Sequence, residues 1–320
     1  MNLGHWLGGE RNRPHPDWDN LATSTARLMP ESSVWPLFGR AVSGLNITLC
    51  MHRVSTTRKN RMTIDERELD HFVEQALAHN PSNERWLTLS FDDGYEDAAN
   101  YIERRARWFP NVEFLFFVCP EKAETGAGFR WDLPGPPDDT DRDIDGENTR
   151  SELLALSHDP AIRLATVEQC RRINALPNAS LGNHTNCHFR SASLSFDDSA
   201  RELRRSHDTF VRLFGEPRHF AFPYGKPNED FDDRHIDTLR ERGDFNIWST
   251  ARRPFHAEDR EPGAVLPRFP VDGSWSAAQV AFWVALLSAR WRNRGINAQI
   301  LRPLRNSLLP PAWKRPSIHP

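Results

Sequence analysis

Runs of apolar residues alternate with amphipathic segments through the middle of the chain. Leu45–Met51 reads LNITLCM and predicts a buried strand, and Trp86–Phe91 and Val112–Val118 predict two more. Between the first two, Asp65–Ala78 has the apolar spacing of an amphipathic helix. Strands that alternate with helices are typical of a parallel sheet with helical crossovers.

The same alternation continues in the second half of the chain. A further amphipathic helix is predicted at Asp198–Phe214. The later strands are predicted at Ala179–Leu181, His219–Phe222, Phe245–Trp248 and Val265–Leu266. The order predicts an α/β fold, a (β/α) barrel of about seven strands, with its chemistry at the carboxyl ends of the strands.

Three parts of the chain differ in composition. Residues 1–44 are rich in Pro, Trp and charge and predict an irregular leader, and residues 45–273 contain the barrel. Residues 274–320 form a basic tail without Asp or Glu. Within the barrel domain, residues 132–147 are acidic and interrupted by Pro and Gly, which is typical of a mobile surface insertion or of a lid.

The tail allows two interpretations. A helix over residues 276–294 could lie on an anionic membrane, with Phe282, Trp283, Leu286 and Leu287 buried and its arginines on phosphates. Alternatively, the same helix could pack on the outside of the barrel. The sequence leaves both open.

Overall composition excludes some classes of protein. There are 41 basic against 44 acidic residues, which argues against a nucleic-acid-binding protein. No apolar run reaches the roughly 18 residues of a membrane span. The first twenty residues lack the pattern of a secretory signal, and the four cysteines have no CxxC pair, so we expect free thiols and a cytoplasmic location. Nothing in the sequence indicates an oligomeric state.

Two adjacent carboxylates follow the predicted strand that ends at Phe91. Asp92 and Asp93 repel each other when both are ionised, so a nearby cation is expected to hold them. One carboxylate could then bind a metal ion while the other accepts a proton from water. Gly94 allows a tight exit from the strand, although Asp-Asp-Gly is also a common turn.

A pair of histidines completes a possible metal site. His184 and His188 are four residues apart, a spacing that lets two imidazoles share one side of a turn. Two histidines and one aspartate form a typical ligand set for a catalytic zinc-like ion. Farther along, Phe220–Gly225 reads FAFPYG, a fixed turn in which the backbone N–H of Tyr224 could face a developing oxyanion.

These motifs resemble a known family. SFDDGYED, GNHTNCH and FAFPYG, in this order, resemble the polysaccharide deacetylases with a NodB-homology domain, carbohydrate esterase family 4. The resemblance covers roughly residues 45–272 and includes the flanking segments MHRV and LPRFPV. It implies a distorted barrel, a divalent metal, usually Zn²⁺, and removal of an N-acetyl group from an amino sugar.

The resemblance also implies roles for individual residues. Asp92 resembles the catalytic base, and Tyr224 would supply the N–H of the oxyanion hole. The metal ligands would be Asp93, His184 and His188. The partner would be an N-acetylated sugar or glycan, and a cytoplasmic location would make it a glycan precursor.

The chain departs from the family pattern at three places. Ala221 stands where most members have an arginine that orients the base, and no Asp-Trp motif follows the strand at Ile247–Trp248. The late Leu-x-His motif is also missing. These departures resemble the subgroup that acts on poly-N-acetylglucosamine-like polymers, in which the acid histidine comes from the N-terminal side.

The departures leave candidates and alternatives. His52 is the candidate general acid and His256 a weaker one, while Arg268 is the candidate partner that replaces the missing arginine beside Asp92. Cys187 could be a thiolate ligand or a small filler, and Trp131 and Trp248 could stack on a sugar or pack in the barrel. A deformylase, a cyclic-amide hydrolase and a glycan-binding pseudoenzyme remain alternative functions.

Overall fold

The computed structural model describes residue 25 and residues 29–292, apart from 58–59, 83, 133–158 and 160–161. Beyond Asp132, the predicted acidic insertion lies outside the described residues. The same is true of most of the leader and of the tail after residue 292.

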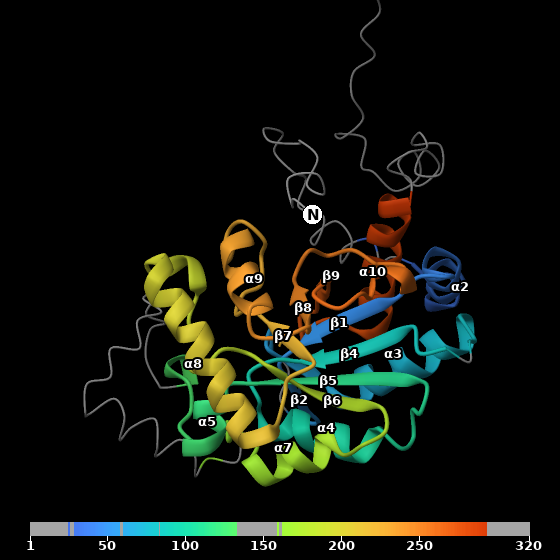
Figure 1. The fold of residues 1–320 in the computed structure, drawn as a ribbon. Coiled ribbons are helices and arrows are strands. Elements are labelled where there is room, and N and C mark those ends of the chain that lie inside the picture. The colour runs from blue at the N-terminus through green and yellow to red at the C-terminus, as the bar shows by residue number, and fades with distance from the viewer. Residues whose placement is uncertain are drawn as a thin grey trace, which may run out of the picture.

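Eight parallel strands form one sheet in the order β10-β1-β4-β5-β6-β7-β8-β9 (Figure 1). Their bounds are β1 Ile47–Met51, β4 Leu87–Phe91, β5 Val112–Val118, β6 Ala179–Asn183, β7 His219–Ala221, β8 Asn246–Ser249, β9 Val265–Pro267 and β10 Phe269–Pro270. A separate parallel pair consists of β2, Arg53–Ser55, and β3, Thr63–Asp65.

The two edges of the sheet are joined by one residue. β9 pairs with β8 at one edge, β10 pairs with β1 at the other, and only Arg268 lies between β9 and β10. The sheet is therefore a nearly closed barrel, which confirms the predicted fold. It has eight strands instead of about seven because the two-residue β10 is too short to give a periodic signal.

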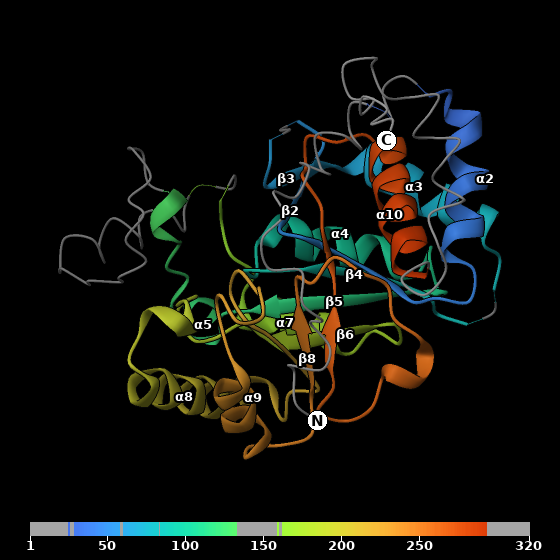
Figure 2. The same ribbon diagram turned by 90° about the horizontal axis from the view of Figure 1, so that it is seen from above.

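Helices cover the outside of the barrel (Figures 1 and 2). α8 and α9 pack together beside β7 and β8, while α2, α3 and α10 form a group beside β1. The helix bounds are α2 Glu31–Val42, α3 Glu66–His79, α4 Glu96–Arg105, α5 Pro120–Thr125, α7 Val167–Asn174, α8 Phe196–Phe214, α9 Asp233–Arg240 and α10 Ala277–Arg292.

Alternate residues of each strand face opposite sides of the barrel wall. On β5, Phe114 and Phe116 pack outward in the core shared with the helices, whereas Leu115 and Phe117 pack in the barrel interior. Both faces are buried, which explains why such strands read as continuous apolar runs. The same alternation determines which residues at the ends of the strands point inward.

The prediction of an irregular leader is wrong for residues 31–42. α2 buries Val34, Trp35 and Phe38 against the rest of the core, although Pro36 lies inside the helix. Proline removes one backbone donor and interrupts a helical pattern, so it conceals this helix in the sequence. Packing of an apolar face stabilises α2 despite the proline.

The tail helix packs on the barrel. α10 contacts α2 and α3, and it buries Phe282 and Trp283 in the protein core. The structure therefore shows the arrangement in which this helix packs on the outside of the barrel. Within the described residues, no helix is both long and apolar enough to span a bilayer.

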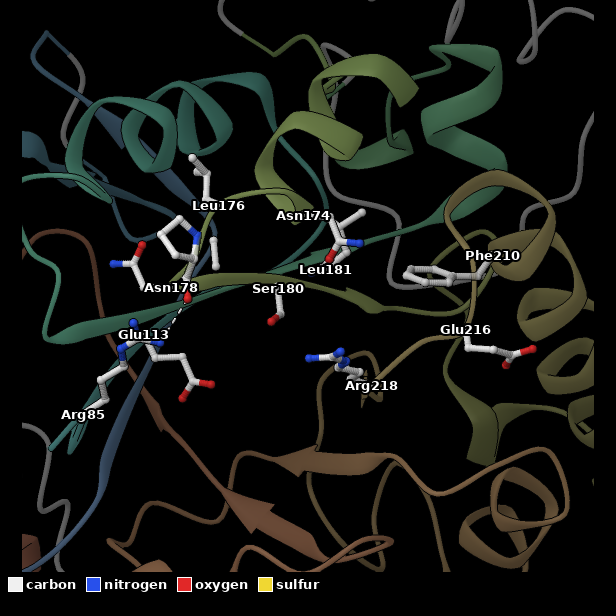
Figure 3. A pocket seen from close by; sticks show the side chains of 12 residues that line it. Arg85, Glu113, Asn174, Leu176, Asn178, Ser180, Leu181, Phe210, Glu216 and Arg218 are labelled. Carbon is white, nitrogen blue, oxygen red and sulfur yellow. Dashed lines mark hydrogen bonds between the residues drawn. The ribbon is translucent and has the colours of Figure 1, made fainter.

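A polar cavity of about 420 Å³ lies at the amino ends of β5 and β6 (Figure 3). Its lining includes Arg85, Glu113 and Arg218. Glu113 Oε2 accepts hydrogen bonds from Thr88 and Arg260 at 2.9 and 2.7 Å. This network lies at the amino end of the barrel, opposite the carboxyl ends where chemistry is expected.

Because His219 is buried near this network, we predict that the free energy of unfolding depends on pH. Burial lowers its pKa to about 4 from 6.5, although the charge of Glu113 opposes the shift. The Trp248 indole donates to His219 Nδ1 at 3.2 Å, so this nitrogen carries no proton. Between pH 6.5 and 4 the unfolded chain therefore binds a proton that the folded chain does not, and stability falls as the pH falls.

We expect His219 to contribute up to roughly 3 kcal/mol to the loss of stability on acidification across that range. Urea unfolding of the wild type and of His219→Gln at pH 7 and pH 5 measures this contribution. The variant should lose less stability on acidification. Equal losses in the two proteins would contradict the prediction.

Candidate metal centre and active site

The carboxyl ends of β1, β4 and β6 bring polar side chains together. Leu89 and Phe91 of β4 pack outward, so the alternation turns Asp92 inward just after the strand. By the same alternation, His184 follows β6 on the inward side. Two residues before His184, position 182 must be glycine, because a Cβ there would lie only 2.3 Å from the Phe117 ring.

The backbone around this site is strained. Six non-glycine residues have positive φ in the described part of the chain, and four of them surround the site: Asp93, Thr185, His188 and Tyr224. Left-handed conformations cost non-glycine residues about 1–3 kcal/mol and cluster at functional sites. Here the four residues lie in the loops that follow β4, β6 and β7.

Asp93, His184 and His188 form a buried triad. Asp93 Oδ1 lies 3.4 Å from His184 Nε2 and 3.3 Å from His188 Nε2. One ligand atom from each of the three residues lies within 4.8 Å of the others. These are the three residues that the sequence predicted as metal ligands.

The triad has the chemistry of a metal site. His184 Nδ1 lies 2.9 Å from the Ala221 carbonyl oxygen, so a proton on Nδ1 leaves the Nε2 lone pair facing Asp93. Asp93 Oδ1 is buried and receives no well-formed hydrogen bond. A neutral imidazole Nε2 and a carboxylate oxygen that converge in this way are a suitable ligand set for a shared cation.

Electrostatics agree with this interpretation. Burial tends to raise the pKa of Asp93, but His188 and His184 outweigh it and hold the pKa well below the usual range. Burial tends to lower the pKa of His184, yet Asp92 and Asp93 together raise it. The pocket therefore favours positive charge, which a divalent cation bound by the triad would supply.

Asp92 is held separately from the triad. Arg268 Nη1 donates to Asp92 Oδ1 at 2.6 Å, and Nη2 donates to Oδ2 at 3.0 Å. Asp92 Oδ2 also lies 4.0 Å from His184 Nε2, beside the candidate metal ligands. A bidentate guanidinium fixes the plane of a carboxylate, and it leaves this one ionised next to the triad.

The position of Arg268 follows from the barrel seam. Its neighbour Phe269 packs outward, so Arg268 points into the interior, where its guanidinium lies 5.1 Å from the centre of the Phe117 ring. Burial tends to raise the pKa of Asp92, but the charge of Arg268, with His184, holds it below its ordinary value. The structure thus places Arg268 where the sequence predicted, as the partner of Asp92.

Cys50 is a contact that the sequence analysis missed. It faces inward on β1, and its thiol donates to Asp92 Oδ2 at 3.4 Å. Burial raises the pKa of this thiol, so it remains a donor rather than a thiolate. The alternation of LNITLCM, which turns Cys50 to the same side as His52, was the available signal.

His52 and Tyr224 also lie at the carboxyl ends of the strands. His52 lies between β1 and β2, and its charge contributes to lowering the pKa of both Asp92 and Asp93. The Tyr224 ring meets the His188 ring edge to face, with centroids 5.3 Å apart. Both residues therefore belong to the surroundings of the triad.

Three other candidates lie outside the groups that form the metal-ligand triad and hold Asp92. Trp248 is fully buried in the barrel interior, so it packs there and cannot stack on a sugar. His256 follows Phe255, which bridges to Asn46 at the amino end of β1, so the prediction of His256 as an acid is wrong. Cys187 is outside the ligand group found among the described residues.

A sequence profile identifies the family of the chain. The sequence profile described as Polysaccharide deacetylase matches residues 79–241, just over half of the 320 residues. The chain belongs to the polysaccharide deacetylase family of hydrolases. It carries the barrel of that family and a candidate Asp-His-His metal triad. No curated protein sequence matches the chain.

Solved structures give a weaker likeness. A de-N-acetylase from Aggregatibacter actinomycetemcomitans is 17% identical with a TM-score of 0.49, over 75% of this chain and 99% of that one. IcaB from Ammonifex degensii is 20% identical with a TM-score of 0.47, over 76% and 98%. The deacetylase PplD from Streptococcus pyogenes is 15% identical with a TM-score of 0.48, over 74% and 96%.

Proposed function

We propose that this chain is a metal-dependent hydrolase that removes the N-acetyl group from an amino sugar in a glycan or glycan precursor. The observation that carries the proposal is that two adjacent carboxylates have different partners. Asp93 points to His184 and His188, while Asp92 is clamped by Arg268 and is not part of the triad. A protein that only bound a glycan would have no need for the second, clamped carboxylate.

Asp93, His184 and His188 would hold the metal, with Zn²⁺ as the expected ion. A bound divalent ion would polarise the amide carbonyl and make water a stronger nucleophile near neutral pH. Asp92 would accept the proton of that water through the carboxylate that Arg268 keeps ionised. Because Arg268 occupies both oxygens of Asp92, the base has a fixed orientation beside the triad.

The leaving amine needs a proton, and His52 is the proposed donor. It lies on the β1 side of the site, and its charge acts on both aspartates. The backbone N–H of Tyr224 is the proposed donor to the oxyanion. These two roles rest on the family resemblance and on the location of both residues at the carboxyl ends of the strands.

One experiment tests the proposal directly. The purified full chain is analysed for bound metal and then assayed for acetate release from N-acetylglucosamine oligomers and lipid-linked N-acetylated sugars. We expect about one divalent ion per chain and acetate release that a chelator abolishes and added zinc restores. Formate release from N-formyl sugars alone would identify a deformylase instead, and a metal-loaded protein inert on every amide would contradict hydrolysis. The cytoplasmic location remains a prediction from the sequence.

A further inference from the structure

Two solvent-exposed aromatic side chains flank the metal ligand His188. Trp131 is 41% exposed and Tyr224 is 39% exposed. Their rings meet the His188 ring edge to face, with centroid distances of 4.8 and 5.3 Å. Exposed aromatic surface next to a buried metal site is available to a substrate.

Trp131 is fixed in place from the protein side. Its ring stacks on the buried Phe129, with centroids 4.4 Å apart and planes only 6° from parallel. The Trp131 indole N–H donates to Tyr95 Oη at 2.9 Å. Phe129 thus covers one face of the indole, and the indole N–H already has a hydrogen-bond acceptor within the protein.

Tyr95 is itself held by two contacts. Its hydroxyl donates to Asp132 Oδ2 at 2.9 Å, and the Arg53 guanidinium lies 4.6 Å from the centre of its ring. The chain of contacts from Arg53 to Trp131 therefore orients the exposed indole before any substrate arrives. A side chain fixed in this way loses little entropy when it binds a ligand.

Trp108 shows that this arrangement is specific to the site. Trp108 is 71% exposed, and the Arg105 guanidinium lies 4.8 Å from the centre of its ring. It lies between α4 and β5, at the amino end of the barrel. Exposure alone does not distinguish the two tryptophans, but only Trp131 contacts a metal ligand.

We propose that Trp131 is the stacking platform for the pyranose ring whose amide is cleaved. This inference rests on the proposed function and adds a recognition residue to it. The apolar C–H face of a hexopyranose matches an indole face, and the indole N–H is already bonded, so Trp131 recognises its ligand by its face. Tyr224 contacts the same His188 ring, and the Arg190 guanidinium lies 4.2 Å from the centre of the Tyr224 ring.

Binding of a product analogue tests the platform without turnover. Calorimetry measures the Kd of the zinc-loaded full chain for glucosamine tetramers with β-1,4 and β-1,6 linkages. We expect Trp131→Ala to weaken binding of the preferred tetramer by roughly tenfold, and Trp131→Phe to recover most of it. The matched control, Trp108→Ala, should bind as the wild type does.

Kinetics with the acetylated tetramer give a second readout. Trp131→Ala should raise KM for acetate release by a similar factor and change kcat little. Wild-type Kd and KM in Trp131→Ala would overturn the platform while acetate release still supported the deacetylase. Failure of the wild type to bind either tetramer would also overturn it. Conversely, Trp131-dependent binding without acetate release would retain Trp131 as a stacking platform for an amino-sugar ring and contradict the proposed function.

Thermal melting separates local from global effects. Trp131→Phe keeps an aromatic ring on Phe129, so it should melt close to the wild type even if Trp131→Ala is destabilised. Weaker binding by a Trp131→Ala protein with a wild-type melting temperature supports the proposal. Restored binding in Trp131→Phe supports it if the alanine variant does not fold.

Discussion

In Asp92→Asn, we expect turnover of the proposed N-acetylated sugar to fall by roughly 10²–10⁴-fold, while bound metal should stay at the wild-type level. Asparagine keeps the shape of aspartate but cannot accept the proton of the attacking water. Metal binding persists because Asp92 lies outside the Asp93, His184 and His188 group. Acetate release and metal content, measured on the same preparation, check both parts of this result.

Asp93→Asn is the matched control for Asp92→Asn. It makes the same chemical change at the adjacent residue, but it weakens a ligand of the triad, so we expect metal loss together with loss of activity. If Asp92→Asn kept full activity, Asp92 would not be the base. If it lost the metal as completely as Asp93→Asn does, the division of roles between the two carboxylates would be wrong.

The second large effect concerns stability and involves Arg268. Arg268→Met removes the guanidinium and leaves the buried carboxylate of Asp92 without its counter-charge. Breaking a buried ion pair from one side typically costs about 3–5 kcal/mol, and we expect a loss of unfolding free energy in that range. Urea unfolding at pH 7 measures it.

A double-mutant cycle tests whether the pair itself is responsible. Asp92→Asn/Arg268→Met removes both buried charges, so it should lose clearly less stability than the sum of the two single variants. Arg268→Lys keeps the charge and loses the bidentate geometry, and we expect an intermediate loss. Additive losses would show that the two side chains act independently.

Most strands of the barrel could be predicted because both of their faces are buried. Val112–Val118 was predicted with its exact bounds, and the other predicted strands differ by two residues or fewer at each end. β2, β3 and β10 were not predicted, because two or three residues carry no periodic signal. α2 was missed for a different reason, since Pro36 interrupts its pattern.

The triad could be predicted because Asp93 and His184 lie within two residues of strand ends and His188 follows in the same loop as His184. Parallel strands carry their carboxyl ends to one edge, so Asp93 and His184 meet wherever the strands pair. His256 was misplaced because proximity to a strand in sequence does not tell which end of the barrel a loop returns to. The support of Trp131 by Phe129 and Tyr95 depends on packing between loops, which no spacing in the sequence encodes.

The seam at Arg268 links assembly of the chain to its chemistry. Because this residue stands alone between strands at opposite edges of the sheet, the two edges must meet before its guanidinium can reach Asp92. In a chain whose barrel is still open, Asp92 would therefore lack the guanidinium that orients it and keeps it ionised. Hydrolytic competence would arise together with the final closure of the fold, so incompletely folded molecules would remain inert toward amides.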